Sequence, residues 1–119
     1  MRYMFLLYGP DRPLPEPGTR EHLEMYGAYH AATSAMAEAG VLVDCAPLRP
    51  VTSATTVRVR DGETLLTDGP AAEIKEQLGG YTIVECAGLD EALKWAATMP
   101  AALEGSVEVR PIVDVEAPS

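Results

Sequence analysis

Asparagine is absent from the sequence, and cysteine and lysine occur only twice each. Without asparagine, the chain has neither an N-glycosylation sequon nor a Cys-His-Asn protease triad. Cys45 and Cys86 lie far apart and form no Cys-x-x-Cys pair, so neither a metal framework nor a redox motif is predicted. Each cysteine lies in an apolar, strand-like segment, which favours buried thiols over a reactive thiol or a disulfide. Scarce lysine with abundant alanine, glycine and proline is typical of a GC-rich bacterial genome.

Long apolar runs are also missing. The first apolar segment, residues 3–8, is too short for a transmembrane helix and lacks the long apolar region and cleavage site of a signal peptide. Positive charge is scarce too, because nine basic residues against eighteen acidic ones give a net charge of -9. Such a surface repels phosphate backbones and anionic lipid headgroups. We therefore expect no nucleic acid and no membrane as partner, and a cytoplasmic location.

What remains is ordinary globular composition. The chain has 119 residues, of which 47% are hydrophobic, and this length suffices to bury one core. We expect a single domain over residues 1–119, with a frayed tail from about residue 115. Apolar residues at helical spacing predict amphipathic helices, and two β-rich runs joined by Asp61-Gly62 predict a hairpin.

The expected strands are residues 3–8, buried on both faces, then 41–48, 81–86 and 106–113, with a hairpin of 55–60 and 63–67. The expected helices are residues 20–39 and 89–99, with one or two helical turns in 71–78. The core face of the first helix should hold Met25, Tyr29, Ala32 and Met36, and that of the last should hold Leu89, Ala92, Leu93, Ala96 and Met99.

This order of elements predicts an α+β fold with a ferredoxin-like sheet and two main helices on one face. Several strands are too apolar to leave the other face in water. A second copy of the chain is the simplest cover, so we expect a twofold homodimer whose two sheets face each other.

Residues 67–81, TDGPAAEIKEQLGGY, resemble the signature of the YCII-related, DGPF-type proteins, whose pattern runs close to TDGPFAETKEQLGGF. The segments RYMFLLY, AGVL, TTVR, LDEALKWA and GSVEVRP are similar to that family as well, so the resemblance covers nearly the whole chain. One position departs from the pattern, because Ala71 replaces the phenylalanine of the family. The missing side chain either opens a pocket beside the turn or leaves space that another side chain fills.

The resemblance implies a dimeric α+β barrel, in agreement with the predicted topology, but it implies less about function. Most DGPF-type proteins have no assigned reaction, some related domains are fused to or encoded near sigma factors, and a related YCII protein is a dehydrochlorinase. A His-Asp pair has been proposed as the site in YCII proteins, with the histidine on the first helix about eleven residues before its terminal glycine. Counting back from Gly40 reaches Tyr29, next to His30, and one position is about 100° of helix rotation.

His30 and Asp68 are therefore the first candidates for catalysis, with Tyr29 as the alternative to His30. His30 lies on the helix row of Leu23 and Tyr26, beside the apolar stripe, where a neutral imidazole serves as a general base. Asp68 would orient that imidazole or polarise a substrate. The alternatives are a helix histidine without a role and an aspartate that caps its own turn.

Candidate ligand-binding residues come from three groups. The polar cluster after the turn would form a lid or a wall over a ligand, or else it is a solvated short helix. Tyrosines in structured segments would line a pocket, or else they pack in the core. An arginine on a strand would bind a carboxylate, or else lie in solvent. The residues are Glu73, Lys75 and Gln77, then Tyr3, Tyr26 and Tyr81, and finally Arg58.

Two functions remain open. The first is a small enzyme that transfers a proton next to a carbonyl or performs an elimination with the His/Asp pair. It would need no cofactor and no metal, since the sequence has no phosphate-binding loop and no cluster of metal ligands. The second is a non-catalytic homodimer that binds a small-molecule ligand or docks onto a transcription-linked partner.

Overall fold

The computed structural model describes residues 1–10, 12–72 and 75–115 of the chain. In chain order its elements are β1 (Arg2–Pro10), α1 (Arg20–Glu38), β2 (Leu42–Pro47), the 3-10 turn η1 (Val51–Ser53), β3 (Thr55–Arg60), β4 (Glu63–Asp68), β5 (Glu76–Glu85), α2 (Leu89–Ala96), α3 (Ala101–Glu104) and β6 (Ser106–Pro111). In this described part, none of the helices combines the length and apolarity that crossing a membrane requires.

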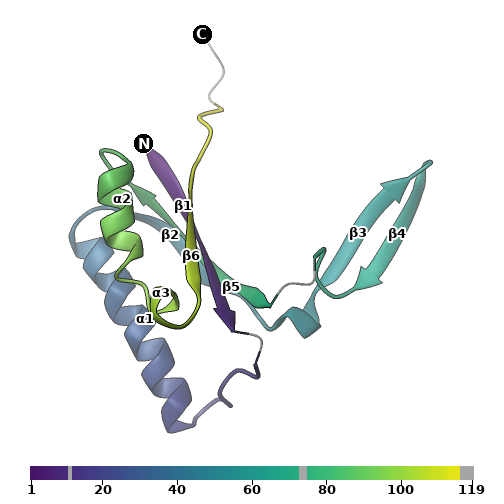
Figure 1. Ribbon diagram of the computed structural model, residues 1–119, viewed down its shortest axis with the longest axis horizontal. Coiled ribbons are helices and arrows are strands. Elements are labelled where there is room, and N and C mark those ends of the chain that lie inside the picture. Colours follow the sequence, from purple (N-terminus) through teal and green to yellow (C-terminus); the bar gives the residue numbers. More distant parts are fainter. Residues whose placement is uncertain (11, 73–74, 116–119) are drawn as a thin grey trace.

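Four strands form one antiparallel sheet in the order β2-β5-β1-β6. Each outer strand follows a helical segment, so two strand-helix-strand units share the sheet, which confirms the predicted ferredoxin-like α+β fold. The three helices lie on the same side of this sheet (Figure 1).

The core lies between the sheet and these helices. Along β1, Tyr3, Phe5 and Leu7 are buried in the cluster that holds Met36 of α1, whereas the alternate residues Met4, Leu6 and Tyr8 are only half-buried. Successive side chains of a strand point to opposite faces. The prediction that this strand is buried on both faces is therefore wrong for the single chain, and we call the side that carries Met4, Leu6 and Tyr8 the open face.

The predicted apolar stripe of the first helix is confirmed, because Met36 is fully buried and Met25, Tyr29 and Ala32 are half-buried. The predicted core face of the last helix is too wide. Ala92, Ala96 and Met99 are buried as expected, but Leu89 and Leu93 are about half exposed. The short helix α2 presents only a narrow strip to the sheet, and its leucines lie outside that strip.

The expected helical turns in residues 71–78 are wrong from Glu76 onward, while residues 73 and 74 lie outside the described residues. Glu76, Gln77 and Leu78 begin β5 and pair with the end of β1. Pairing with a central strand outweighs the local helix preference of these three residues.

The predicted hairpin is confirmed, with Asp61 and Gly62 both at positive φ, as the tight turn between its strands requires. Its strands, β3 and β4, form a separate two-stranded sheet that projects from the molecule (Figure 1). The helices lie on one side of the four-stranded sheet and this hairpin lies on the other. We call residues 55–68 the arm.

The two cysteines differ in exposure. Cys86 is buried, as expected, but Cys45 is exposed, so the prediction of two buried thiols is wrong for Cys45. Cys45 lies on β2, which is an edge strand, and the helices do not cover its side chain. Burial raises the pKa of the Cys86 thiol, and the nearby Glu91 carboxylate raises it further.

Candidate functional site

Tyr29 and His30 lie on different sides of α1. Tyr29 is half-buried and packs against the core, and this burial, followed by the charge of Glu104, raises the pKa of its hydroxyl above the ordinary value. His30 is exposed, and its Nε2 lies 3.5 Å from Ser34 Oγ. Of the two candidates, Tyr29 therefore faces the body of the molecule and His30 faces solvent.

Asp68 is exposed at the base of the arm, opposite Thr55. Other groups hold the turn that follows it, because the Gly69 N–H donates to the Ala54 carbonyl at 2.7 Å and Thr56 Oγ1 donates to the Gly69 carbonyl at 2.7 Å. Within the described residues, the Asp68 carboxylate makes no hydrogen bond or ion pair. The turn does not depend on this side chain, which leaves the carboxylate available to another group.

A single chain does not join Asp68 to His30. No hydrogen bond or ion pair links the two within the described residues, and Figure 1 shows α1 and the arm on opposite sides of the sheet. A site that uses both side chains would need a second chain to bring them together.

The three tyrosines expected at a ligand site lie in different surroundings. Tyr3 is buried in the core, with its hydroxyl 3.6 Å from Met1 Sδ. Tyr26 is exposed on α1, and its ring lies 4.6 Å from the His22 ring, measured between centroids. The Tyr81 hydroxyl donates to Asp44 Oδ2 at 3.1 Å, and this hydrogen bond together with the aspartate charge raises the Tyr81 pKa.

The remaining predicted ligand residues follow the arm. Arg58 Nη2 donates to the Ala71 carbonyl at 3.4 Å and so ties the arm to the segment that follows it. Lys75 is exposed just before β5, and Gln77 is half-buried in β5 opposite Gly9. Glu73 lies outside the described residues.

A depression of about 270 Å³ lies at the end of the open face, and of its lining residues only Glu76 belongs to the polar cluster that the sequence offers as a ligand contact. Tyr8 pairs with Ser106, and Leu6 pairs with Glu108, so these side chains share the open face. The Ser106 hydroxyl donates to Glu76 across the end of β1, and Glu108 pairs with Arg110. The residues that line the depression are Tyr8, Glu76, Ser106, Val107 and Glu108.

Sequence reasoning missed this depression because the strand register places its residues together. Tyr8 and Ser106 are at opposite ends of the chain, and Glu76 was assigned to helical turns rather than to β5. The alternating pattern of residues 106–110 was a usable signal, since it places Ser106 and Glu108 on one face of the last strand.

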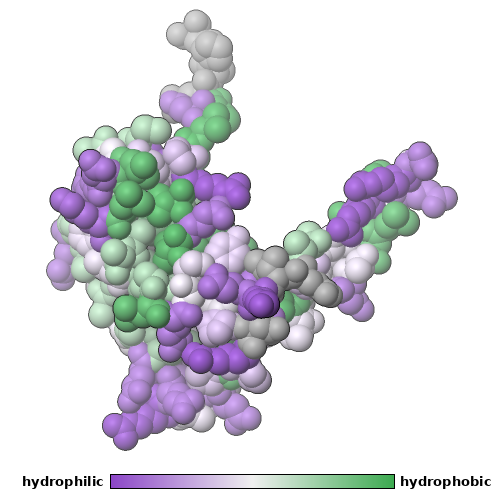
Figure 2. All heavy atoms as spheres, viewed as in Figure 1, coloured by the Kyte–Doolittle hydropathy of each residue, from purple (hydrophilic) through white to green (hydrophobic). Residues whose placement is uncertain are grey.

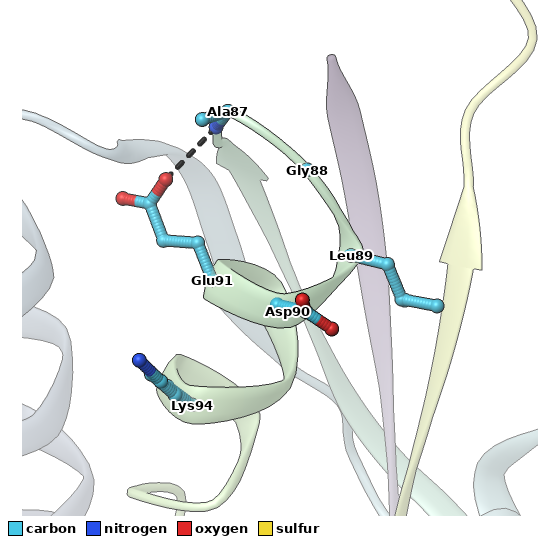
Figure 3. Close-up of a pocket in the computed structure, with 6 residues that line it drawn as sticks. All are labelled: Ala87, Gly88, Leu89, Asp90, Glu91 and Lys94. Atoms are coloured by element: carbon cyan, nitrogen blue, oxygen red, sulfur yellow. Dashed lines mark hydrogen bonds between the residues drawn. The ribbon is translucent and has the colours of Figure 1, made fainter.

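A larger pocket of about 530 Å³ lies at the start of α2 but is a weaker candidate. One continuous segment lines it, and Figure 3 shows the side chains of Leu89, Asp90 and Lys94 pointing in different directions. Glu91 Oε2 already accepts a hydrogen bond from the Ala87 N–H at 2.8 Å. The pocket therefore has no group of side chains that converges on a ligand. Within the described residues, no three His, Cys, Asp or Glu side chains are grouped as a metal site would need.

A family model matches almost the whole chain, and a relative and a solved structure are similar to it. The YCII-related domain matches residues 1–116. An uncharacterized protein of Rhizobium meliloti is 40% identical over 114 residues, which cover 94% of this chain and 92% of that one. The solved structure of 5-chloro-2-hydroxyhydroquinone dehydrochlorinase from Burkholderia phenoliruptrix, in complex with 2,5-dihydroxybenzoquinone, aligns over 95% of this chain and 94% of that one, with 19% identity and a TM-score of 0.48. The match over nearly all of its length shows that this chain belongs to the YCII-related family, as its residues 67–81 predict.

Proposed function

We propose that this protein is a homodimer that binds a small molecule rich in hydrogen-bond donors. The depression at the end of the open face is the observation that carries this proposal. Polar side chains from three neighbouring strands, Tyr8, Glu76, Ser106 and Glu108, converge on it, whereas one continuous segment lines the pocket at the start of α2. Small-molecule sites are typically concave, with a few convergent polar groups.

The chemistry of these side chains selects the ligand. Glu76 and Glu108 are acceptors, and the hydroxyls of Tyr8 and Ser106 both donate and accept. A ligand with hydroxyl or amino groups satisfies them, whereas an anion meets two carboxylates, of which only Glu108 is paired with an arginine. The volume of about 270 Å³ fits a molecule of about one six-membered ring.

The apolar surface around the depression supports the homodimer. Met4, Leu6 and Ile83 are half-buried apolar side chains on the open face, and no described element covers them. An apolar face of this kind is typical of an interaction surface. Stacking the open face of a second copy on it would bury these side chains and add a wall to the depression.

Titration of isotope-labelled protein with catechol, followed by amide chemical shifts, tests the proposal. We expect shifts at the ends of β1, β5 and β6, and none with benzoate, which has a similar size but carries a carboxylate. Glu76→Gln should weaken catechol binding, while Glu38→Gln, an exposed glutamate on α1, should not. Shifts elsewhere, or equal binding by the two variants, would refute the site.

An acid–base enzyme is the second candidate, and the free Asp68 carboxylate on its hydrogen-bonded turn favours it. A side chain held in place without an internal partner is preorganised for a substrate or an imidazole. In this function, His30 or Tyr29 of one chain moves a proton, and Asp68 of the other orients it or stabilises charge. Proton abstraction next to a carbonyl and elimination are the reactions that such a pair supports.

Mixing two inactive variants tests this shared site. A screen of enolisable and halogenated compounds first identifies a turnover, and His30→Gln and Asp68→Asn should each abolish it. An equal mixture should regain about a quarter of the activity, because half of the dimers are mixed and each of those holds one intact pair. Full activity in the Asp68→Asn variant would exclude the role of Asp68.

A further inference from the structure

The arm has one apolar and one polar face. Val57 pairs with Leu66, and Val59 pairs with Thr64, so the three apolar side chains lie on the same face, where they are 59%, 68% and 59% exposed for Val57, Leu66 and Val59. The opposite face carries Arg58 with Leu65 and Arg60 with Glu63. Figure 2 shows apolar atoms along the arm beside hydrophilic ones.

Among the described residues, no other element supports the arm. Its hydrogen bonds to neighbouring segments, from Thr56 to Gly69 and from Arg58 to Ala71, lie near its base and leave the tip and the apolar face uncovered. An isolated two-stranded hairpin is at best marginally stable in water, so a persistently folded arm needs another structural element packed against it.

The accessible surface of the chain indicates how much area a partner could cover. The accessible surface is 8574 Å², whereas a compact chain of 12.7 kDa exposes about 6,200 Å². The radius of gyration is 16.4 Å, against about 13.5 Å for a compact chain of this length. The excess of roughly 2,300 Å² is more than the roughly 800 Å² that one partner contributes to a standard stable interface. The chain therefore exposes enough surface to bury an interface with a folded partner.

The reach of the arm fits a second copy of the chain as that partner. Each strand of the arm has six residues and so spans about 20 Å, whereas two sheets packed face to face lie about 10 Å apart. The arm and the open face lie on the side of the sheet away from the helices (Figure 1). When the open faces of two copies stack, the arm of each extends past the sheet of the other.

We propose that the arm clasps the second subunit of the homodimer through the face formed by Val57, Val59 and Leu66. The inference rests on the homodimer put forward above and adds the part of each chain that holds the other. It also places the base of the arm, with Asp68, on the interface side of the sheet, whereas α1 with His30 lies on the other side, so the clasp by itself does not bring these two side chains together.

Leu66→Lys and Leu65→Lys make a matched pair, because the two leucines are adjacent, exposed and on opposite faces of β4. Sedimentation equilibrium should show a dimer dissociation constant raised by about 100-fold or more for Leu66→Lys, since each of two arms loses a buried leucine worth about tenfold or more. Leu65→Lys should stay within about threefold of the unmodified protein. Both positions are exposed in the single chain, so neither change should affect its folding.

Hydrogen exchange of the arm amides separates the remaining outcomes. We expect protection of β3 and β4 above the dissociation constant and its loss on dilution below it. A dimer that both lysine variants weaken equally, or not at all, overturns the clasp and leaves the homodimer in place. A protein that stays monomeric overturns both, and protection that persists in the monomer shows that the arm packs on its own chain.

Discussion

Gly105 packs so closely against Tyr8 that a Cβ atom on Gly105 would lie 2.0 Å from the Tyr8 carbonyl oxygen. This contact fixes the start of β6 against the end of β1 and so places Ser106 beside the depression. Only glycine allows the two main chains to approach in this way.

Gly105→Ala should therefore destabilise the protein by about 3 kcal/mol or more, because the main chain of β1 or β6 must move. Urea denaturation measures this change. Gly27→Ala is the control, since Gly27 lies in α1 with no atom within 4 Å of its added Cβ. It should stabilise the protein by about 0.5–1 kcal/mol through better helix propensity. Equal stability of the two variants would contradict the close approach.

Met36→Ala tests the core between α1 and the sheet. Met36 is fully buried, and removing its side chain should cost about 2–5 kcal/mol of unfolding free energy. Leu23→Ala on the same helix should change stability by less than about 0.5 kcal/mol, because Leu23 is 66% exposed. Calorimetric melting of both variants gives the comparison, and a small loss for Met36→Ala would place α1 elsewhere.

Tyr81 should ionise above the ordinary tyrosine pKa of about 10, because its hydroxyl donates to Asp44. Its folded pKa exceeds the unfolded value, so the stabilisation that it supplies is complete below about pH 10 and is lost as the pH rises through the folded pKa. NMR of labelled tyrosine rings follows this titration. Asp44→Asn should lower the Tyr81 pKa and leave that of Tyr29 unchanged, and an unchanged Tyr81 would contradict the pairing.

The two thiols should differ in reactivity. Cys45 is exposed, whereas Cys86 is buried and has a raised pKa, so it carries little thiolate near neutral pH. An aromatic disulfide reagent should modify one thiol per chain quickly and the second only after unfolding. Mass spectrometry should locate the fast product at Cys45. Rapid modification of Cys86 would show that the segment around it opens readily.

Sequence patterns predict the large elements well, because each of them depends on local spacing. The stripe through Met36 and the Asp61-Gly62 turn are both visible within a few residues of sequence. Residues 76–78 are different, because their conformation is set by pairing with β1, which lies far away in the sequence. No local pattern contains that pairing.

The candidate site likewise depends on contacts between residues that are distant in the sequence. The sequence offers His30 with Tyr29 as its alternative, and only the packing of α1 in the folded chain shows that Tyr29 is half-buried and His30 exposed. The depression beside Tyr8 depends on the register of three strands and on the irregularity between Leu7 and Tyr8 in the β1–β5 pairing. Residue types alone predict neither the packing of α1 nor this strand register.

The pairing of β1 has a consequence for biosynthesis. β1 is made before the other three strands of its sheet, yet its partners are β5 and β6, so Tyr3 can pair with Val84 and Pro111 only after those later segments have been made. Until then the nascent chain exposes an apolar strand that has no partner strand. We expect ribosome-associated chaperones to bind this segment early and to release it when residues 106–111 emerge.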